Sequence, residues 1–162
     1  MSHPPPRRDP HAYLGAVEMR TLESRLLAGN AVGDPCVREV PVYLPPQALA
    51  DPSARFPVVY VLAGFTGRGH KYLETHPWRL GVVTRYDRAV AAGDAPPAIL
   101  VLPDCFTSFG GSQYVDSEFL GPYESHLALE LVPFVDAHYP TRPGRRGAVG
   151  KSSGGFGARP RR

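Results

Sequence analysis

Apolar and polar residues alternate in two segments near the start of the chain, 20–28 and 37–44. A period of two is typical of half-buried antiparallel strands. The segment between them, 29–35, contains glycine, asparagine and proline, which favour turns. The pattern therefore predicts a β-hairpin at the edge of a sheet.

Three later runs, 58–62, 98–102 and 146–149, are short and largely apolar, and glycine or proline stands close to their ends. Such runs are typical of strands that are buried on both faces of a sheet. The first of them follows a proline-rich loop, 45–57. We expect these three strands to form the centre of the sheet.

Helical spacing of apolar residues appears between these runs. It predicts one helix over 80–92, with Gly93 at its carboxyl end as a cap. A second helix is predicted from Pro122 to about His138, with a kink at Pro133 because proline lacks the amide hydrogen of a helix interior. Strands that alternate with helices indicate an α/β fold, with a mostly parallel sheet and helices on both of its faces.

The ligands of such sheets bind where the parallel strands end. Three segments rich in glycine or turn residues follow the three buried strands, namely 64–67, 103–114 and 150–155. The middle one continues into a long turn-rich segment, 105–121, which we interpret as a functional loop rather than a linker. A site is therefore expected where these segments meet.

Composition favours a globular protein and excludes several other classes. Of the 162 residues, 43% are hydrophobic, which suits one globular domain over 15–162 preceded by a flexible, proline-rich arm over 1–14. We find no apolar run long enough for a signal peptide or a membrane span, so we expect a cytoplasmic protein that does not bind membranes. The cysteines, Cys36 and Cys105, are expected to stay reduced, and neither a metal nor another cofactor is expected.

The formal net charge of +3 is unevenly distributed. Residues 142–162 hold seven basic residues and no acidic one, which leaves 11 basic and 15 acidic residues before them. A nucleic-acid-binding face is usually broader than one basic end. We therefore do not expect nucleic-acid binding.

The sequence Gly-Lys-Ser-Ser at 150–153 has features of two kinds of site. A phosphate-binding loop, G-x-x-x-x-G-K-[ST], requires glycine at position 145, where this chain has Arg145. Residues 150–154 instead read G-x-S-x-G. A predicted strand precedes this motif, and small residues that can begin a helix follow it. This is the context of the nucleophile elbow of α/β-hydrolases. The glycines would permit a tight, strained turn that exposes the hydroxyl of Ser152.

Four segments, 56–67, 95–104, 112–141 and 146–158, together resemble the esterase D family. That family also takes in enterochelin-esterase-like hydrolases and the mycolyltransferase antigens. The resemblance implies an α/β-hydrolase fold and the cleavage of small-molecule carboxylic esters or thioesters through an acyl-enzyme. By the same resemblance, Ser152 is the nucleophile.

The resemblance also implies an oxyanion hole made of two backbone amides, those of Ser153 and Phe65. Many relatives have histidine near the start of the loop that contains Phe65, where this chain has Ala63; the backbone donates, so this difference is tolerable. Gln113 and Tyr114 are expected to line the acyl pocket, and packing of their loop is the alternative role.

A serine nucleophile needs a histidine base and an acid that orients the histidine, and in α/β-hydrolases both follow the nucleophile. The ten residues after Ser152 contain neither. Of the six histidines, His70 and His76 follow the loop of Phe65 and are the candidates for a substitute base. The resemblance implies that Asp104, at the end of a strand, forms a structural turn.

We therefore expect the chain to be the amino-terminal part of an esterase, without the carboxyl-terminal part of the fold and impaired in turnover. Its last predicted strand would be an exposed edge through which copies self-associate. The alternative is a non-catalytic remnant that binds an acyl ligand or a partner protein. The pattern identifies neither the acyl group nor the alcohol.

Overall fold

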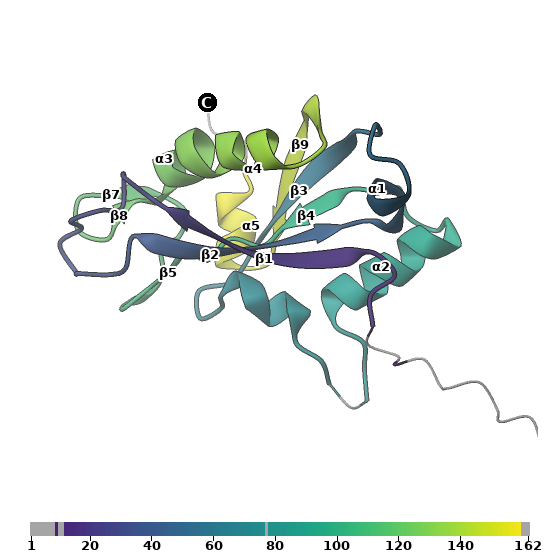
Figure 1. The fold of residues 1–162 in the computed structure, drawn as a ribbon. Helices are drawn as coiled ribbons and strands as arrows, with labels where there is room; N and C mark the ends of the chain where they lie inside the picture. Colours follow the sequence, from purple (N-terminus) through teal and green to yellow (C-terminus); the bar gives the residue numbers. More distant parts are fainter. Residues whose placement is uncertain (1–8, 10–11, 77, 160–162) are drawn as a thin grey trace, which may run out of the picture.

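The computed structural model describes residues 9, 12–76 and 78–159. Most of the predicted arm, residues 1–8 and 10–11, lies outside these residues. A five-stranded sheet with the order β1-β2-β4-β3-β9 forms the centre (Figure 1). Its strands are β1 (Ala16–Glu23), β2 (Val37–Leu44), β3 (Phe56–Leu62), β4 (Ile99–Val101) and β9 (Thr141–Gly150).

The sheet is mixed rather than mostly parallel. Strand β3 pairs parallel with β4 and β9, as expected for the three buried strands. Strand β2, however, pairs antiparallel with both β1 and β4, because the amino-terminal hairpin joins the sheet directly beside β4. Two of the four pairings are therefore antiparallel.

Helices lie on both faces of the sheet, as predicted (Figure 1). Their bounds are α1 (Pro46–Ala50), η1 (Gly69–Leu73), α2 (Val82–Ala92), α3 (Tyr123–Ser125), η2 (His126–Leu131), α4 (Val132–His138) and α5 (Ser153–Gly157). Helix α2 ends at Gly93 with φ of 83°, which confirms the predicted cap. The continuous helix 123–138 is π-helical over η2, which ends two residues before Pro133. The kink at Pro133 stays a prediction.

The core has one layer on each face of the sheet. Alternate residues of the strands separate the layers: Val58, Tyr60 and Leu62 pack with the helix 123–138, whereas Val61 packs with residues of α2 and η1. The long loop 105–121 folds into two small ribbons. These ribbons pair β5 (Phe106–Thr107) with β6 (Gly110–Gly111) and β7 (Asp116–Ser117) with β8 (Gly121–Pro122).

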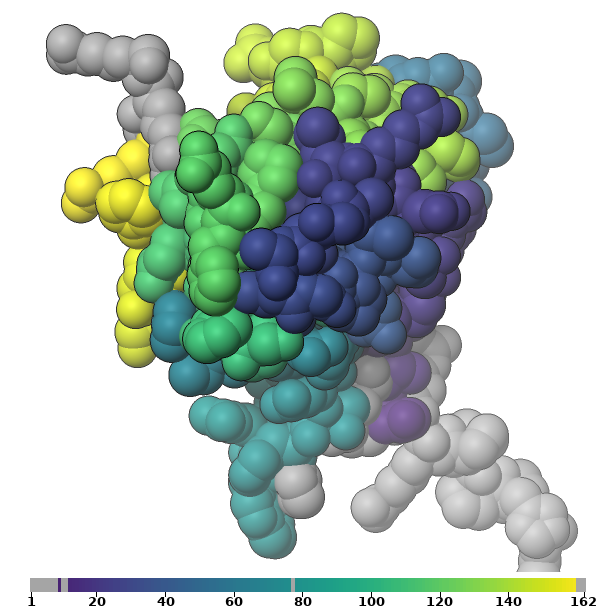
Figure 2. Space-filling model, turned by 90° about the vertical axis from the view of Figure 1, so that its left-hand side faces the viewer, coloured from purple at the N-terminus to yellow at the C-terminus, as the bar shows by residue number. Residues whose placement is uncertain are grey.

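The first strand ends earlier than its alternating pattern predicted, at Glu23 instead of residue 28. Beyond it, the hydroxyl of Ser24 and the amides of Arg25 and Leu26 donate hydrogen bonds to the carboxylate of Glu130 in η2. Figure 2 shows the segment that follows β1 lying against the residues around β7 and β8. A tertiary contact therefore ends the strand.

Strand β9 is longer than the predicted run of 146–149 and lies at the edge of the described sheet. Most of its residues are exposed, and the exposed fraction of Val149 is 51%. Self-association through this edge remains a prediction.

The described residues include both cysteines of the chain. Cys36 and Cys105 are free thiols, as predicted. Among the described residues, no helix has the length and apolar composition that crossing a membrane requires.

Candidate active site

Ser152 stands in the tight turn that joins β9 to α5. Its φ of 58° and ψ of −123° lie in a region that residues other than glycine rarely occupy. The amide of Phe156 donates a hydrogen bond of 3.0 Å to the carbonyl oxygen of Ser152, which starts the helix behind the turn. Ser152 is exposed, so the strained turn expected from the motif is present.

Residues 150–154 form a segment that we call the elbow. Close backbone contacts require its two glycines, Gly150 and Gly154. A Cβ atom at position 150 would lie 2.5 Å from the carbonyl carbon of Gly154. A Cβ atom at position 154 would overlap the carbonyl oxygen of Leu62 and lie 2.9 Å from that of Ala63. The elbow is therefore pressed against the end of β3 and has no room for side chains at these two positions.

The loop after β3, residues 63–68, which we call the donor loop, lies beside Ser152. A Cβ atom built on Gly64 would be 4.0 Å from the Cβ atom of Ser152. The amide of Gly67 donates a hydrogen bond of 2.9 Å to the carbonyl oxygen of Gly64. That carbonyl shares a planar peptide with the amide of Phe65, so this turn also sets the direction of the Phe65 N–H group.

The two predicted oxyanion donors are amides without an acceptor. The amide of Ser153 begins α5, and the first amides of a helix have no partner within it. In the described part of the chain, neither this amide nor that of Phe65 donates to another group. Neither amide is therefore engaged by the described part of the chain, and their role as oxyanion donors stays a prediction.

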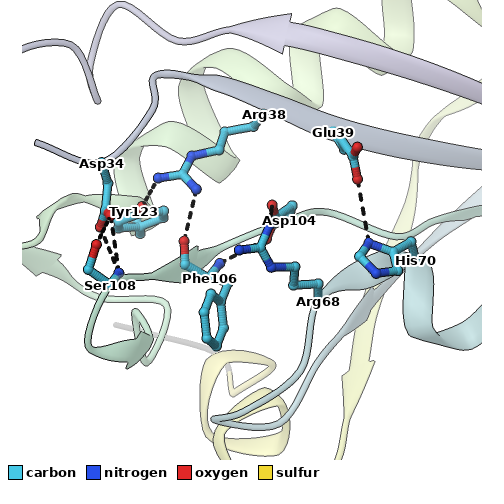
Figure 3. Close-up of polar contacts among 9 residues, drawn as sticks. All are labelled: Asp34, Arg38, Glu39, Arg68, His70, Asp104, Phe106, Ser108 and Tyr123. Atoms are coloured by element: carbon cyan, nitrogen blue, oxygen red, sulfur yellow. Dashed lines mark hydrogen bonds and ion pairs between the residues drawn. The ribbon is translucent and has the colours of Figure 1, made fainter.

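The far end of the donor loop is held by polar contacts (Figure 3). The guanidinium of Arg68 lies 3.5 Å from a carboxylate oxygen of Asp104 and 4.8 Å from the centroid of the Phe106 ring. The other carboxylate oxygen of Asp104 accepts a hydrogen bond of 3.0 Å from the amide of Phe106. Asp104 thus forms the structural turn that the resemblance implied.

Tyr114 reaches the donor loop from the loop 105–121. Its side chain is buried, and its hydroxyl donates a hydrogen bond of 2.7 Å to the carbonyl oxygen of Ala63. Burial raises the pKa of Tyr114 well above its usual range, so the hydroxyl keeps its proton at neutral pH. The contact supports the packing role that the sequence left as an alternative. Contact of Gln113 and Tyr114 with an acyl group remains a prediction.

A cavity of about 350 Å³ lies beside Tyr114, between the sheet and the helix 123–138. Leu62, Leu127 and Val132 contribute apolar surface to it. Its volume is within the range of sites for small molecules.

The sequence did not indicate that Tyr72 also contacts this region. The hydroxyl of Tyr72, in η1, donates a hydrogen bond of 3.3 Å to the carbonyl oxygen of Leu62. No local motif marks a tyrosine that folds back onto a strand ten residues earlier, so only the structure reveals this contact.

The described histidines all have partners other than Ser152. His70 lies 3.4 Å from the carboxylate of Glu39 (Figure 3), and His76 accepts a hydrogen bond of 3.2 Å from the amide of Trp78. His126 pairs with Glu130 and His138 with the carbonyl of Phe134, each at 2.8 Å. His3 and His11 lie outside the described residues. None of the described histidines therefore pairs with Ser152, and a substitute role for His70 or His76 stays a prediction.

Similar structures share this arrangement of strands and helices. A ferulic acid esterase is 24% identical, with a TM-score of 0.68 over 91% of this chain and 53% of its own. An S-formylglutathione hydrolase from Agrobacterium tumefaciens is 23% identical, with a TM-score of 0.66 over 91% and 52% of the two chains. The enterobactin esterase of Shigella flexneri is 18% identical, with a TM-score of 0.58 over 88% and 31%.

At these identities the likeness establishes an α/β-hydrolase type of fold and no more. The chain spans about half the length of the first two of these structures. None of the curated proteins matches it in sequence. A family model described as "Putative esterase" matches residues 34–158, which is most of the chain and includes both the donor loop and the elbow. The chain belongs to this esterase family.

Proposed function

We propose that this chain carries the nucleophile and the oxyanion-binding amides of a serine hydrolase that cleaves small-molecule carboxylic esters or thioesters. The observation that carries the proposal is the backbone of Ser152, whose φ of 58° places an exposed serine in a strained turn beside the donor loop. Strain of this kind persists where the surrounding structure enforces it, and it often marks a functional site.

In the proposed reaction, the hydroxyl oxygen of Ser152 attacks the carbonyl carbon of the ester. The carbonyl oxygen becomes an oxyanion, which accepts hydrogen bonds from the amides of Phe65 and Ser153. The alcohol or thiol leaves with a proton, and water then hydrolyses the acyl-serine. Names of the similar structures, a ferulic acid esterase and an S-formylglutathione hydrolase, fit this reaction class and do not select an acyl group.

The first step requires a base that takes the hydroxyl proton. Each described histidine contacts another group, so we expect this chain of 162 residues to hydrolyse a short-chain nitrophenyl ester slowly and to react weakly with a fluorophosphonate. Added imidazole, acting as an external base, should accelerate the labelling.

The test is fluorophosphonate labelling read by mass spectrometry. Labelling should map to Ser152 and disappear in Ser152→Ala. It should persist in Ser53→Ala, since Ser53 lies in an exposed turn before β3 and contacts Asp51. Equal labelling of the parent chain and Ser152→Ala would refute the nucleophile. Absence of labelling at Ser152 even with imidazole would favour the non-catalytic binding module, whereas fast ester turnover without imidazole would show that a base is already present.

A further inference from the structure

Two consecutive peptide groups of the donor loop each accept a hydrogen bond through their carbonyl oxygen. The carbonyl of Ala63 accepts from the Tyr114 hydroxyl at 2.7 Å, and the carbonyl of Gly64 accepts from the Gly67 amide at 2.9 Å. The second peptide contains the amide of Phe65. Because the two peptides share the α-carbon of Gly64, a glycine with few steric limits, holding the first peptide restricts the rotation of the second.

Tyr114 is itself held rigidly. Both Gln113 and Tyr114 have φ of 58°, and consecutive non-glycine residues in this region need support from their surroundings. The amide of Tyr114 donates to the hydroxyl of Ser112 at 3.2 Å, and the side chain is only 5% exposed.

The ring of Tyr114 also contacts the helix that follows the elbow. A Cβ atom at position 157 of α5 would come within 2.5 Å of the ring. One side chain therefore touches both the donor loop and the helix behind Ser152.

We propose that Tyr114 is a positioning residue for the oxyanion hole, in that its hydroxyl fixes the donor loop and so aims the Phe65 amide at the oxyanion formed beside Ser152. This inference rests on the proposed function. It assigns Tyr114 an indirect role in the reaction, through the Ala63 carbonyl. Preorganised donors stabilise an oxyanion because they need no rearrangement when the charge forms.

The first test is amide hydrogen exchange in Tyr114→Phe, which keeps the ring and removes the hydroxyl. Exchange of the Gly67 amide should accelerate by about tenfold, in line with the loss of one hydrogen bond that holds the loop. Amides of β3 should exchange as before. Tyr86→Phe is the matched control, because its hydroxyl donates to a backbone carbonyl, that of Pro96, at 2.9 Å outside the site.

The second test is the rate of fluorophosphonate labelling at Ser152 in the presence of imidazole. Tyr114→Phe should label about tenfold more slowly, a smaller loss than complete removal of an oxyanion donor causes. Tyr86→Phe should label at the parent rate, and thermal denaturation should show whether Tyr114→Phe keeps its global stability.

The outcomes separate this inference from the proposed function. Labelling that is the same in the parent chain and in Ser152→Ala would overturn the proposed function, while the exchange comparison would still decide whether Tyr114 holds the donor loop. Unchanged exchange at Gly67, or faster exchange with unchanged labelling at Ser152, would overturn the positioning role. A general acceleration of exchange, β3 included, would overturn it in favour of a purely structural role.

Discussion

The elbow and the donor loop meet at the candidate active site, yet they are fixed in different ways. The elbow can pack closely only because Gly150 and Gly154 have no side chains. A Cβ atom at either position would overlap neighbouring backbone. The donor loop is held by groups from elsewhere in the chain, namely the hydroxyl of Tyr114, which donates to the Ala63 carbonyl, and the carboxylate of Asp104, which pairs with Arg68. The elbow should therefore be sensitive to added atoms, and the donor loop to lost hydrogen bonds.

The largest effect is expected from Gly154→Ala. The new methyl group would overlap the carbonyl oxygen of Leu62, which belongs to the backbone and has little freedom to move. We expect the free energy of unfolding to fall by about 3 kcal/mol or more, measured by urea denaturation. Gly147→Ala is the control, since nothing lies within 4 Å of a Cβ atom there. Similar urea midpoints for the two variants would contradict the role assigned to close packing in the elbow.

A smaller effect is expected from Gly157→Ala, which tests whether the two segments are independent. The new methyl group would lie 2.5 Å from the ring of Tyr114, and a ring can shift where a backbone carbonyl cannot. We expect a loss of about 2 kcal/mol in urea denaturation. The shift should also accelerate exchange of the Gly67 amide. If stability falls while that exchange rate stays constant, then Tyr114 does not link α5 to the donor loop.

The smallest effect on stability is expected when the pH is lowered. It should arise at His126 and Glu130, outside both the elbow and the donor loop. Burial lowers the pKa of His126, partly opposed by its hydrogen bond to Glu130, while Arg38 acts in the same direction as burial. The pKa of Glu130 is also lowered: burial opposes this, but hydrogen bonds from His126, Ser24 and the amides of Leu26 and Arg25 outweigh it.

The unfolded chain therefore binds more protons than the folded one once the pH falls below the ordinary histidine pKa of 6.5. Stability is complete above that pH and decreases as the pH falls through the lower pKa of the folded state. Urea midpoints at pH 7.5 and 5.5 should show this decrease, and His126→Gln should reduce the difference between them. An equal decrease in the variant would place the acid response elsewhere.

The amino-acid sequence predicted those features that depend on near neighbours in the chain. The apolar runs of β3 and β4, the cap at Gly93 and the elbow around Ser152 were each predicted at or near their observed positions. Glycine spacing is informative there because a side chain at Gly150 is excluded by Gly154 of the same turn.

Tertiary structure decided the features that depend on distant residues. The alternating pattern continued past Glu23, but Glu130 ends the strand with hydrogen bonds from residues more than 100 positions away. The partner of the Tyr114 hydroxyl is likewise 51 residues distant, and His70 pairs with Glu39 of β2, a partner that its spacing does not indicate. Steric limits on the backbone act locally and can be read from a motif, whereas the partner of a side chain is set by which elements the sheet brings together.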